Sequence, residues 1–247
     1  MSDRNEMSTA EKESGFGMTE GGPDPKKIPD LEPLKFENYK TVLILERHGE
    51  SVGNAERTYH GHSDIPLSER GYVQVARSAE LLKSTKIDAI YSSDLRRAME
   101  TAEAHLGYHK ELSIEPCEKL REIHVGKWQG MKVVDIIEEY GEYFTVEWKE
   151  KFGTFRGAPG GESVPDGAVR FTEALLDIAR KNIGKTVLVA SHAAVIRAAF
   201  AKIKGIAPED VAVELPFPTN ASLTVVYFDG ERLISGEFSH DSHLADT

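Results

Sequence analysis

The hydrophobic pattern along the chain alternates between short apolar runs and longer amphipathic stretches. Apolar runs of strand length occupy residues 41–46, 87–93, 112–116 and 186–191. Such continuous, β-branched-rich runs are typical of strands that are buried on both faces. Hydrophobic residues recur at helical spacing over residues 67–84, 94–106, 168–182 and 192–203. Strands that alternate with helices predict a largely parallel sheet.

Capping and turn residues indicate where the predicted helices and strands begin and end. Ser68 and Asp94 stand where the first and second amphipathic stretches would need an N-cap, and Gly184 and Gly205 follow two helix ends. Residues 131–155 look helical but irregular. Near the C-terminus, two apolar runs at 222–228 and 233–238 flank Asp229-Gly230 and predict a closing hairpin.

Together these elements predict an α/β fold. We expect a three-layer sandwich, with a mostly parallel central sheet, helices on both faces and a C-terminal antiparallel hairpin. Residues 1–37 are rich in Glu, Ser, Gly and Pro, which predicts a flexible N-terminal extension before a single domain at 38–247. In such sheets, ligands bind outside the carboxyl ends of the strands.

Composition narrows the class of partner. The formal net charge of -11 argues against nucleic acid, although a few arginines in a pocket can still bind a small phosphorylated ligand. Cys117 is the single cysteine, so no internal disulfide can form and a reducing compartment fits. No apolar run reaches the length of a membrane span, and no signal peptide is apparent. We therefore expect a cytoplasmic protein with no membrane partner.

Polar clusters follow three of the predicted strands. Arg47-His48 follows the first, residues 92–97 (SSDLRR) follow the second, and Ser191-His192 follows the late strand. The sheet would bring these clusters to one edge. Two imidazoles beside guanidiniums, without a cysteine, describe an anion pocket, and the histidine spacing matches no zinc pattern. We therefore expect neither a metal nor a cofactor.

A phosphoryl group suits such a pocket. Guanidiniums bind phosphate oxygens in pairs, and a histidine can attack phosphorus to form a phosphohistidine. The leaving alkoxide then needs a proton from a carboxylic acid. Glu122 and Glu118, in or beside LREIHVGKWQG, are both candidates, and their spacing alone does not choose between them.

Several of these segments, taken together, resemble the histidine phosphatase superfamily, also called phosphoglycerate mutase-like, along nearly all of residues 40–244. The matching segments, in order, are ERHGES with Asn54 (46–54), GHSDIPLSERG (61–71), YSSDLRRAMETA (91–102), LREIHVGKWQG (120–130), GGES (160–163), VLVASHAAVIR (187–197) and TNASLTVVYF (219–228).

The resemblance implies roles for the central residues. His48 would accept the phosphoryl group, and Arg47 and Arg97 would clamp the phosphate. Arg97 is matched because the family has an arginine directly before alanine, which leaves Arg96 as a surface residue. Glu122 would donate a proton and then activate water. We expect the two arginines to keep His48 neutral, since a like charge disfavours protonation.

Further positions follow from the same resemblance. Asn54 and a protonated His192 would donate hydrogen bonds to the phosphate, and the backbone N–H of Ala193 would face it from a helix N-terminus. Contacts with the rest of the substrate would come from His60, Gly61, Ile123, His124 and Val125. For His60 and His124, a position on the rim facing solvent remains an equal alternative.

Some positions depart from the family. Ala193-Ala194 stand where glycines are common, and Glu46 stands at a usually apolar position without an obvious role. Gly49 is expected to allow a tight backbone turn behind His48. Residues 131–160, the predicted helical lid, carry lysines and Arg156 but lack the arginine pair that mutases use.

These features favour a phosphatase that acts on a small phosphorylated metabolite. A phosphoglycerate-mutase-type phosphotransferase is the alternative enzyme, and a non-catalytic phospho-ligand-binding module is the alternative of another class. Residues 55–63 and the lid would set specificity, and the lid aromatics, Tyr140, Phe144, Trp148, Phe152 and Phe155, form either pocket walls or an ordinary core. The substrate, the oligomeric state and the role of the extension stay open.

Overall fold

The structure is a computed structural model that describes residues 39–245 and 247. The predicted N-terminal extension at 1–37 lies outside the described residues. No helix among the described residues has both the length and the apolar character needed to cross a membrane.

Within the described residues, six strands form one sheet in the order β3-β2-β4-β1-β5-β6. The strands are β1 (Thr41–Arg47), β2 (Ala89–Ser92), β3 (Ile114–Pro116), β4 (Lys185–Ser191), β5 (Leu223–Phe228) and β6 (Leu233–Ser235). Strands β3, β2, β4 and β1 run parallel, whereas β5 and β6 are antiparallel to their neighbours. The mostly parallel sheet and the C-terminal hairpin are both confirmed.

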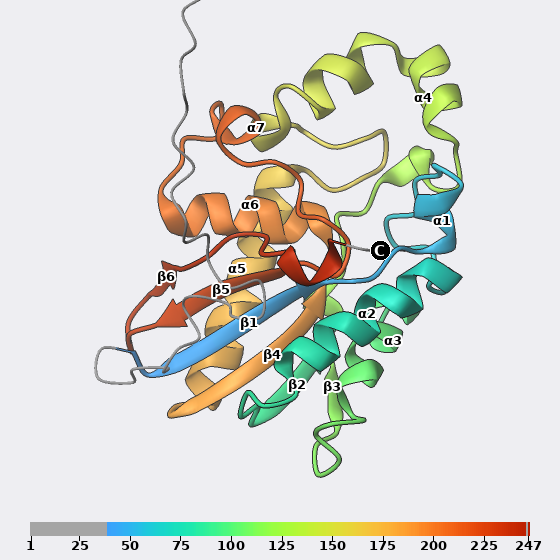
Figure 1. Cartoon of the computed structure of the whole chain (residues 1–247). Helices are drawn as coiled ribbons and strands as arrows, with labels where there is room; N and C mark the ends of the chain where they lie inside the picture. Colours follow the sequence, from blue (N-terminus) through green and yellow to red (C-terminus); the bar gives the residue numbers. More distant parts are fainter. Residues whose placement is uncertain (1–38, 246) are drawn as a thin grey trace, which may run out of the picture.

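Helices cover both faces of this sheet (Figure 1). They are α1 (Val52–Ala55), α2 (Glu69–Leu82), α3 (Arg96–His105), α4 (Val133–Tyr140), α5 (Val164–Lys181), α6 (Ala193–Lys204) and α7 (Val211–Glu214). On one face, Leu43 and Leu45 of β1 pack with side chains of α5 and α6. On the other, Val42 and Ile44 pack with α2 and α3. This alternation buries β1 on both sides and confirms the three-layer sandwich.

Two helices begin elsewhere than the pattern predicts. Helix α5 starts at Val164 rather than 168, because the Ser163 hydroxyl accepts a hydrogen bond from the Asp166 N–H and Pro165 suits a first helical turn. Helix α3 starts at Arg96 with no side-chain cap. Asp94, predicted to begin that helix, instead binds the Arg121 guanidinium.

Residues 131–160 are irregular, as predicted. After α4 the chain forms a π-helix at Tyr143–Trp148 and a 3₁₀ turn at Phe152–Thr154. The side chains of Phe144, Phe152 and Phe155 are buried. These three pack in the same core cluster as Trp128, so the lid aromatics mainly form a core. Figure 1 shows α4 beyond the edge of the sheet, above α1.

Candidate active site

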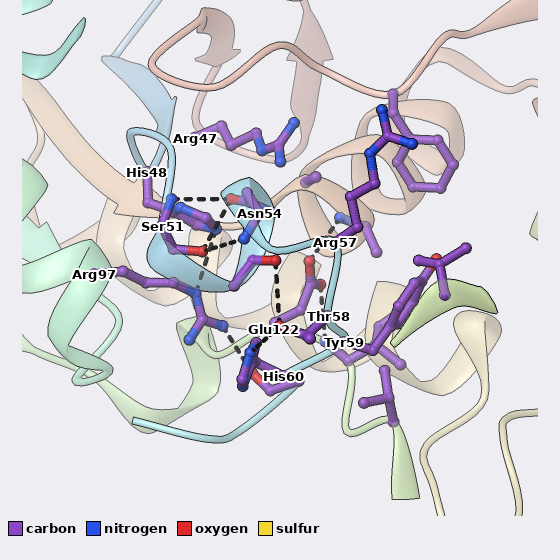
Figure 2. A pocket seen from close by; sticks show the side chains of 18 of the residues that line it. Arg47, His48, Ser51, Asn54, Arg57, Thr58, Tyr59, His60, Arg97 and Glu122 are labelled. Atoms are coloured by element: carbon purple, nitrogen blue, oxygen red, sulfur yellow. Dashed lines mark hydrogen bonds between the residues drawn. The ribbon is translucent and has the colours of Figure 1, made fainter. Parts of the chain in front are cut away.

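The carboxyl ends of β1 and β4 bring the two strand-ending histidines together. Arg47 closes β1, and the N–H of the following His48 donates to the Ser191 carbonyl at the end of β4 over 2.9 Å. The imidazole centroids of His48 and His192 lie 5.2 Å apart. Arg47, His48, Arg97 and Glu122 surround one cavity in Figure 2.

The hydrogen bonds of His48 define its tautomer. Nδ1 lies 2.7 Å from the Gly49 carbonyl oxygen, which can only accept, so Nδ1 carries the proton. Nε2 is then unprotonated and accepts a hydrogen bond from Arg97 Nε over 3.3 Å. Burial, and then the charges of Arg97 and Arg47, hold the pKa of His48 well below its ordinary value. The imidazole is therefore neutral, although burial rather than the arginines is the main cause.

Both predicted clamp arginines are fixed by backbone carbonyls. Arg97, in the first turn of α3, donates to the carbonyls of Ser63 and Gly61 over 3.0 and 2.8 Å. Arg47 donates to the Pro218 carbonyl over 2.5 Å, and its buried Nε has no partner among the described residues. Burial lowers the pKa of each guanidinium to about 10, so both stay cationic at neutral pH. The neighbouring Arg96 is exposed and pairs with Glu100, as expected.

Glu122 sits at the N-terminus of α6. Its carboxylate accepts hydrogen bonds from the N–H groups of Ala194 and Val195 over 3.0 and 3.2 Å. The N–H of Ile123 donates to the same carboxylate over 2.8 Å. Glu118, the other candidate acid, is exposed and pairs with Arg121 away from the cavity. Of the two candidate acids, Glu122 lines the cavity and Glu118 does not, a difference that sequence spacing alone could not reveal.

His192 differs from its expected state. It is fully buried, its Nε2 lies 2.8 Å from the Ser93 hydroxyl, and it is not among the residues that line the cavity. Burial, followed by the charges of Arg97 and His48, lowers its pKa well below the ordinary value. Burial and the neighbouring positive charges thus favour a neutral imidazole at His192, whereas the resemblance implies a protonated one.

The segment after β1 places Asn54 at the cavity. Ser51 caps α1, and both its N–H and its hydroxyl donate to Asn54 Oδ1 over 3.1 Å. Asn220 Nδ2 donates to the same oxygen over 3.2 Å. With its oxygen used in this way, the Asn54 amide nitrogen remains available as a donor to a bound anion.

The residues predicted to contact the rest of the substrate divide into two groups. The cavity is lined by His60, Gly61, Ile123 and Val125, and also by Ala193, whose N–H is expected to face the phosphate. His124 lies outside it and packs edge-on against His62, which favours the rim alternative. At Gly61 the φ of +46° and the Val125 Cγ2 atom, 2.7 Å from an ideal Cβ, both require glycine.

The cavity has a volume of about 330 Å³, which suits a small ligand. Beyond the predicted residues it is lined by Ser51, Gly53, Arg57, Thr58, Tyr59, Val133, Trp148, Ala194 and Phe217. Arg57, Thr58 and Tyr59 fall in the predicted specificity region, but no pattern singled out their side chains. Phe217 belongs to none of the sequence motifs. Lys127, Lys132, Lys149, Lys151 and Arg156 do not line the cavity.

Glu46 acquires a role from a buried network. Its carboxylate is fully buried, accepts a hydrogen bond from the Ser78 hydroxyl and lies 2.7 Å from His105 Nε2. Along α3, Arg97 contacts His48, Thr101 Oγ1 accepts from the Gly49 N–H over 3.2 Å, and His105 contacts Glu46. Because residues four apart share a helix face, one face of α3 holds the end of β1 at three points.

Gly49 is required for a different reason from the predicted one. It does not have a positive φ. An ideal Cβ at this position would lie 2.7 Å from the Gly71 carbonyl oxygen and 2.8 Å from Val75 Cγ1. Close approach of α2, rather than an unusual turn, excludes a side chain there.

Over residues 39–245 and 247, no three His, Cys, Asp or Glu side chains are grouped so that they could hold a metal ion.

The chain is similar in sequence and in structure to several known proteins. The chain is 33% identical to a metal-independent phosphoserine phosphatase of Arabidopsis thaliana, with 87% of each chain covered. It is 30% identical to a 2,3-bisphosphoglycerate-dependent phosphoglycerate mutase 2 of Gloeobacter violaceus, over 69% of this chain and 78% of the relative. The structure of a mycobacterial glucosyl-3-phosphoglycerate phosphatase with VO3 matches with a TM-score of 0.71 and 27% identity, over 80% of this chain and 98% of that one.

A family profile gives the broader assignment. The profile described as histidine phosphatase superfamily, branch 1, matches residues 43–238, which include every residue that lines the cavity. The chain therefore belongs to the histidine phosphatase superfamily, in agreement with the resemblance that its motifs carry.

Proposed function

We propose that this protein hydrolyses a small phosphomonoester in two displacements, with His48 as the phosphate acceptor and Glu122 as the proton donor. One observation carries the proposal: the unprotonated Nε2 of His48 lies beside the Arg97 guanidinium in a cavity that Arg47 and Glu122 also line. A neutral nitrogen nucleophile next to fixed cations suits a phosphate dianion, whose charge spreads over its oxygens during transfer.

In the first displacement, His48 Nε2 attacks phosphorus and the bond to the ester oxygen breaks. Glu122, as the general acid, gives its proton to the departing alkoxide. Arg47, Arg97 and the Asn54 amide hold the phosphate oxygens. The products of this step are an alcohol, phosphohistidine and the Glu122 carboxylate.

In the second displacement, the Glu122 carboxylate takes a proton from water as the water oxygen attacks phosphorus. The P–N bond breaks, inorganic phosphate leaves, and His48 regains its neutral form. Residues 131–160 act as the lid over the leaving group, through Val133 and Trp148 at the cavity wall. We expect the reaction to take place in the cytoplasm, where the single Cys117 stays reduced.

A phosphoglycerate mutase is the second candidate, because relatives with that name match the chain. A mutase needs cations for a second charged group and must shield the phosphohistidine from water. The lysines of residues 131–160 and Arg156 lie outside the cavity lining, which leaves Arg57 as a single guanidinium there in place of the arginine pair that mutases use and favours hydrolysis. A non-catalytic binding module would use the arginines but would have no use for His48 Nε2.

The deciding experiment is a panel of phosphomonoesters incubated with the full chain, with inorganic phosphate as the readout. Hydrolysis predicts phosphate release, whereas a mutase would convert 3-phosphoglycerate to 2-phosphoglycerate with little release. Rapid quenching should trap an acid-labile, base-stable phosphoprotein that is absent from His48→Ala. Binding of phosphate esters without either reaction would establish the non-catalytic module instead.

A further inference from the structure

Arg57 is a third guanidinium at the cavity, apart from the phosphate clamp. It lines the cavity together with Tyr59, Trp148 and Phe217. Figure 2 shows its side chain on the side of the cavity away from His48 and Arg97. Arg47 and Arg97 are held by backbone carbonyls, whereas the exposed Arg57 side chain has no hydrogen-bond or ion-pair partner among residues 39–245 and 247. The Arg57 guanidinium is thus free to bind an anion that enters the cavity.

The backbone makes arginine an unexpected choice at this position. Arg57 has a φ of +56°, in the left-handed region that glycine or asparagine adopts at least cost. The turn is fixed by its neighbours, since the Thr58 N–H donates to the Gly53 carbonyl over 2.8 Å and the Val133 N–H donates to the Arg57 carbonyl over 2.9 Å. Local backbone preference therefore opposes arginine at this position.

The number of cations indicates which anion fits. The phosphate end has two guanidiniums, Arg47 and Arg97, which match a dianionic phosphate. The other end has one, because none of the cations of residues 131–160 lines the cavity. A single guanidinium matches a single negative charge, and its planar fork suits a carboxylate. The aromatic side chains of Tyr59, Trp148 and Phe217 line the same cavity.

We propose that Arg57 binds a carboxylate on the leaving group, so that the preferred substrates are phosphate esters of small hydroxy acids. This inference rests on the proposed hydrolase function and adds a specificity-determining residue to it. The cavity volume of about 330 Å³ limits the leaving group to a few heavy atoms beyond the phosphate.

The test uses substrate pairs that differ in one carboxylate: O-phosphoserine with O-phosphoethanolamine, and 3-phosphoglycerate with glycerol 3-phosphate. The full chain should hydrolyse the carboxylated member of each pair with the higher kcat/KM. In Arg57→Gln this preference should fall about tenfold, the effect of losing one charge-assisted hydrogen-bond pair. Lys151→Gln removes the same charge outside the cavity, where Lys151 pairs with Glu147, and should keep the preference.

Arg57→Gly is the control for misfolding of the Arg57→Gln variant. Glycine suits a φ of +56°, so this protein should unfold at the same temperature as the parent or a higher one, and should still lose the preference. A variant that lost both stability and preference would instead assign Arg57 to the turn.

The outcomes separate the two proposals. No hydrolysis of any ester would remove the proposed function and the inference with it. Hydrolysis with equal kcat/KM within each pair, or a preference that survives Arg57→Gln, would overturn the inference alone. A preference for fructose 1,6-bisphosphate over fructose 6-phosphate that depends on Arg57 would assign this end to a second phosphate and overturn the carboxylate.

Discussion

At one end of the cavity, Arg47 and His48 stand at the close of β1, and Arg97 stands in the first turn of α3. Each of these side chains is bonded to backbone carbonyls. At the other end, Arg57 and Phe217 belong to irregular segments and are exposed to solvent. The proposed reacting groups thus lie at the ends of regular elements, and the groups proposed to meet the leaving group lie in irregular segments. Such an arrangement lets specificity change while the chemistry is kept.

The sharpest test of the phosphate end is His48→Ala. Without the nucleophilic nitrogen, phosphate release should fall by a factor on the order of 10⁴ or more. The phosphoprotein should disappear as well. His124→Ala is the matched control, because that histidine lies nearby but outside the cavity. Substantial release by His48→Ala would exclude the covalent route.

The next largest effect is expected from Arg97→Gln. Losing one donor to the transferring phosphoryl group should reduce kcat/KM by about 10²–10³. Because Arg97 is one of the charges that lower the pKa of His48, its removal should raise that pKa toward the ordinary value. Protonated His48 cannot attack, so the acidic limb of the kcat/KM profile should move to higher pH.

Arg96→Gln provides the adjacent comparison. It removes an exposed guanidinium that pairs with Glu100, and it should change neither the rate nor the acidic limb. If both variants shift the limb equally, a general loss of positive charge is responsible rather than the contact with His48.

Glu46→Ala tests the buried hydrogen bonds that join the end of β1 to α2 and α3. This change leaves the buried His105 and the Ser78 hydroxyl without their hydrogen-bond partner and should cost about 2 kcal/mol in the free energy of unfolding. Glu80→Ala removes an exposed carboxylate of α2, whose ion pair is screened by solvent, and should leave the free energy of unfolding nearly unchanged. Urea unfolding measures both. Equal midpoints for the two variants would show that the Glu46 network contributes little.

Substitutions at the leaving-group end of the cavity, which is lined by Arg57, Trp148 and Phe217, should have the smallest effect on the kinetics. Phe217 is 40% exposed, so Phe217→Leu removes only part of an apolar wall and should raise KM by about threefold. The size of the change should vary with the leaving group, which can be followed by measuring KM across the substrate panel. A drop in the yield of trapped phosphoprotein would contradict this division of the cavity, because it would link Phe217 to the chemical step.

The fold and the phosphate end were accessible from sequence because they rest on local rules. Buried strand patterns predicted the sheet, and the rule for strand ends placed Arg47 and His48 correctly. Glu122 needed the resemblance, since its place at the start of α6 depends on contacts across 72 and 73 positions. Glu46 could not be interpreted because its partners lie 32 and 59 positions away.

The leaving-group end was harder to predict for a related reason. Phe217 reaches the cavity through the loop before β5, and no periodicity marks a loop side chain that faces a ligand. Trp148 was one of five aromatics in the lid, and only packing shows that it lines the cavity while Phe144 and Phe152 do not.

The three contacts along α3 also bear on which sequence changes the domain can accept. Arg97, Thr101 and His105 reach the end of β1 only while the intervals between them stay at four residues. Each residue of an α-helix advances the side chains by about 100° around the axis. One residue inserted or deleted between positions 97 and 105 would therefore turn part of this face away from β1. This helix should accept many substitutions but hardly any change in length.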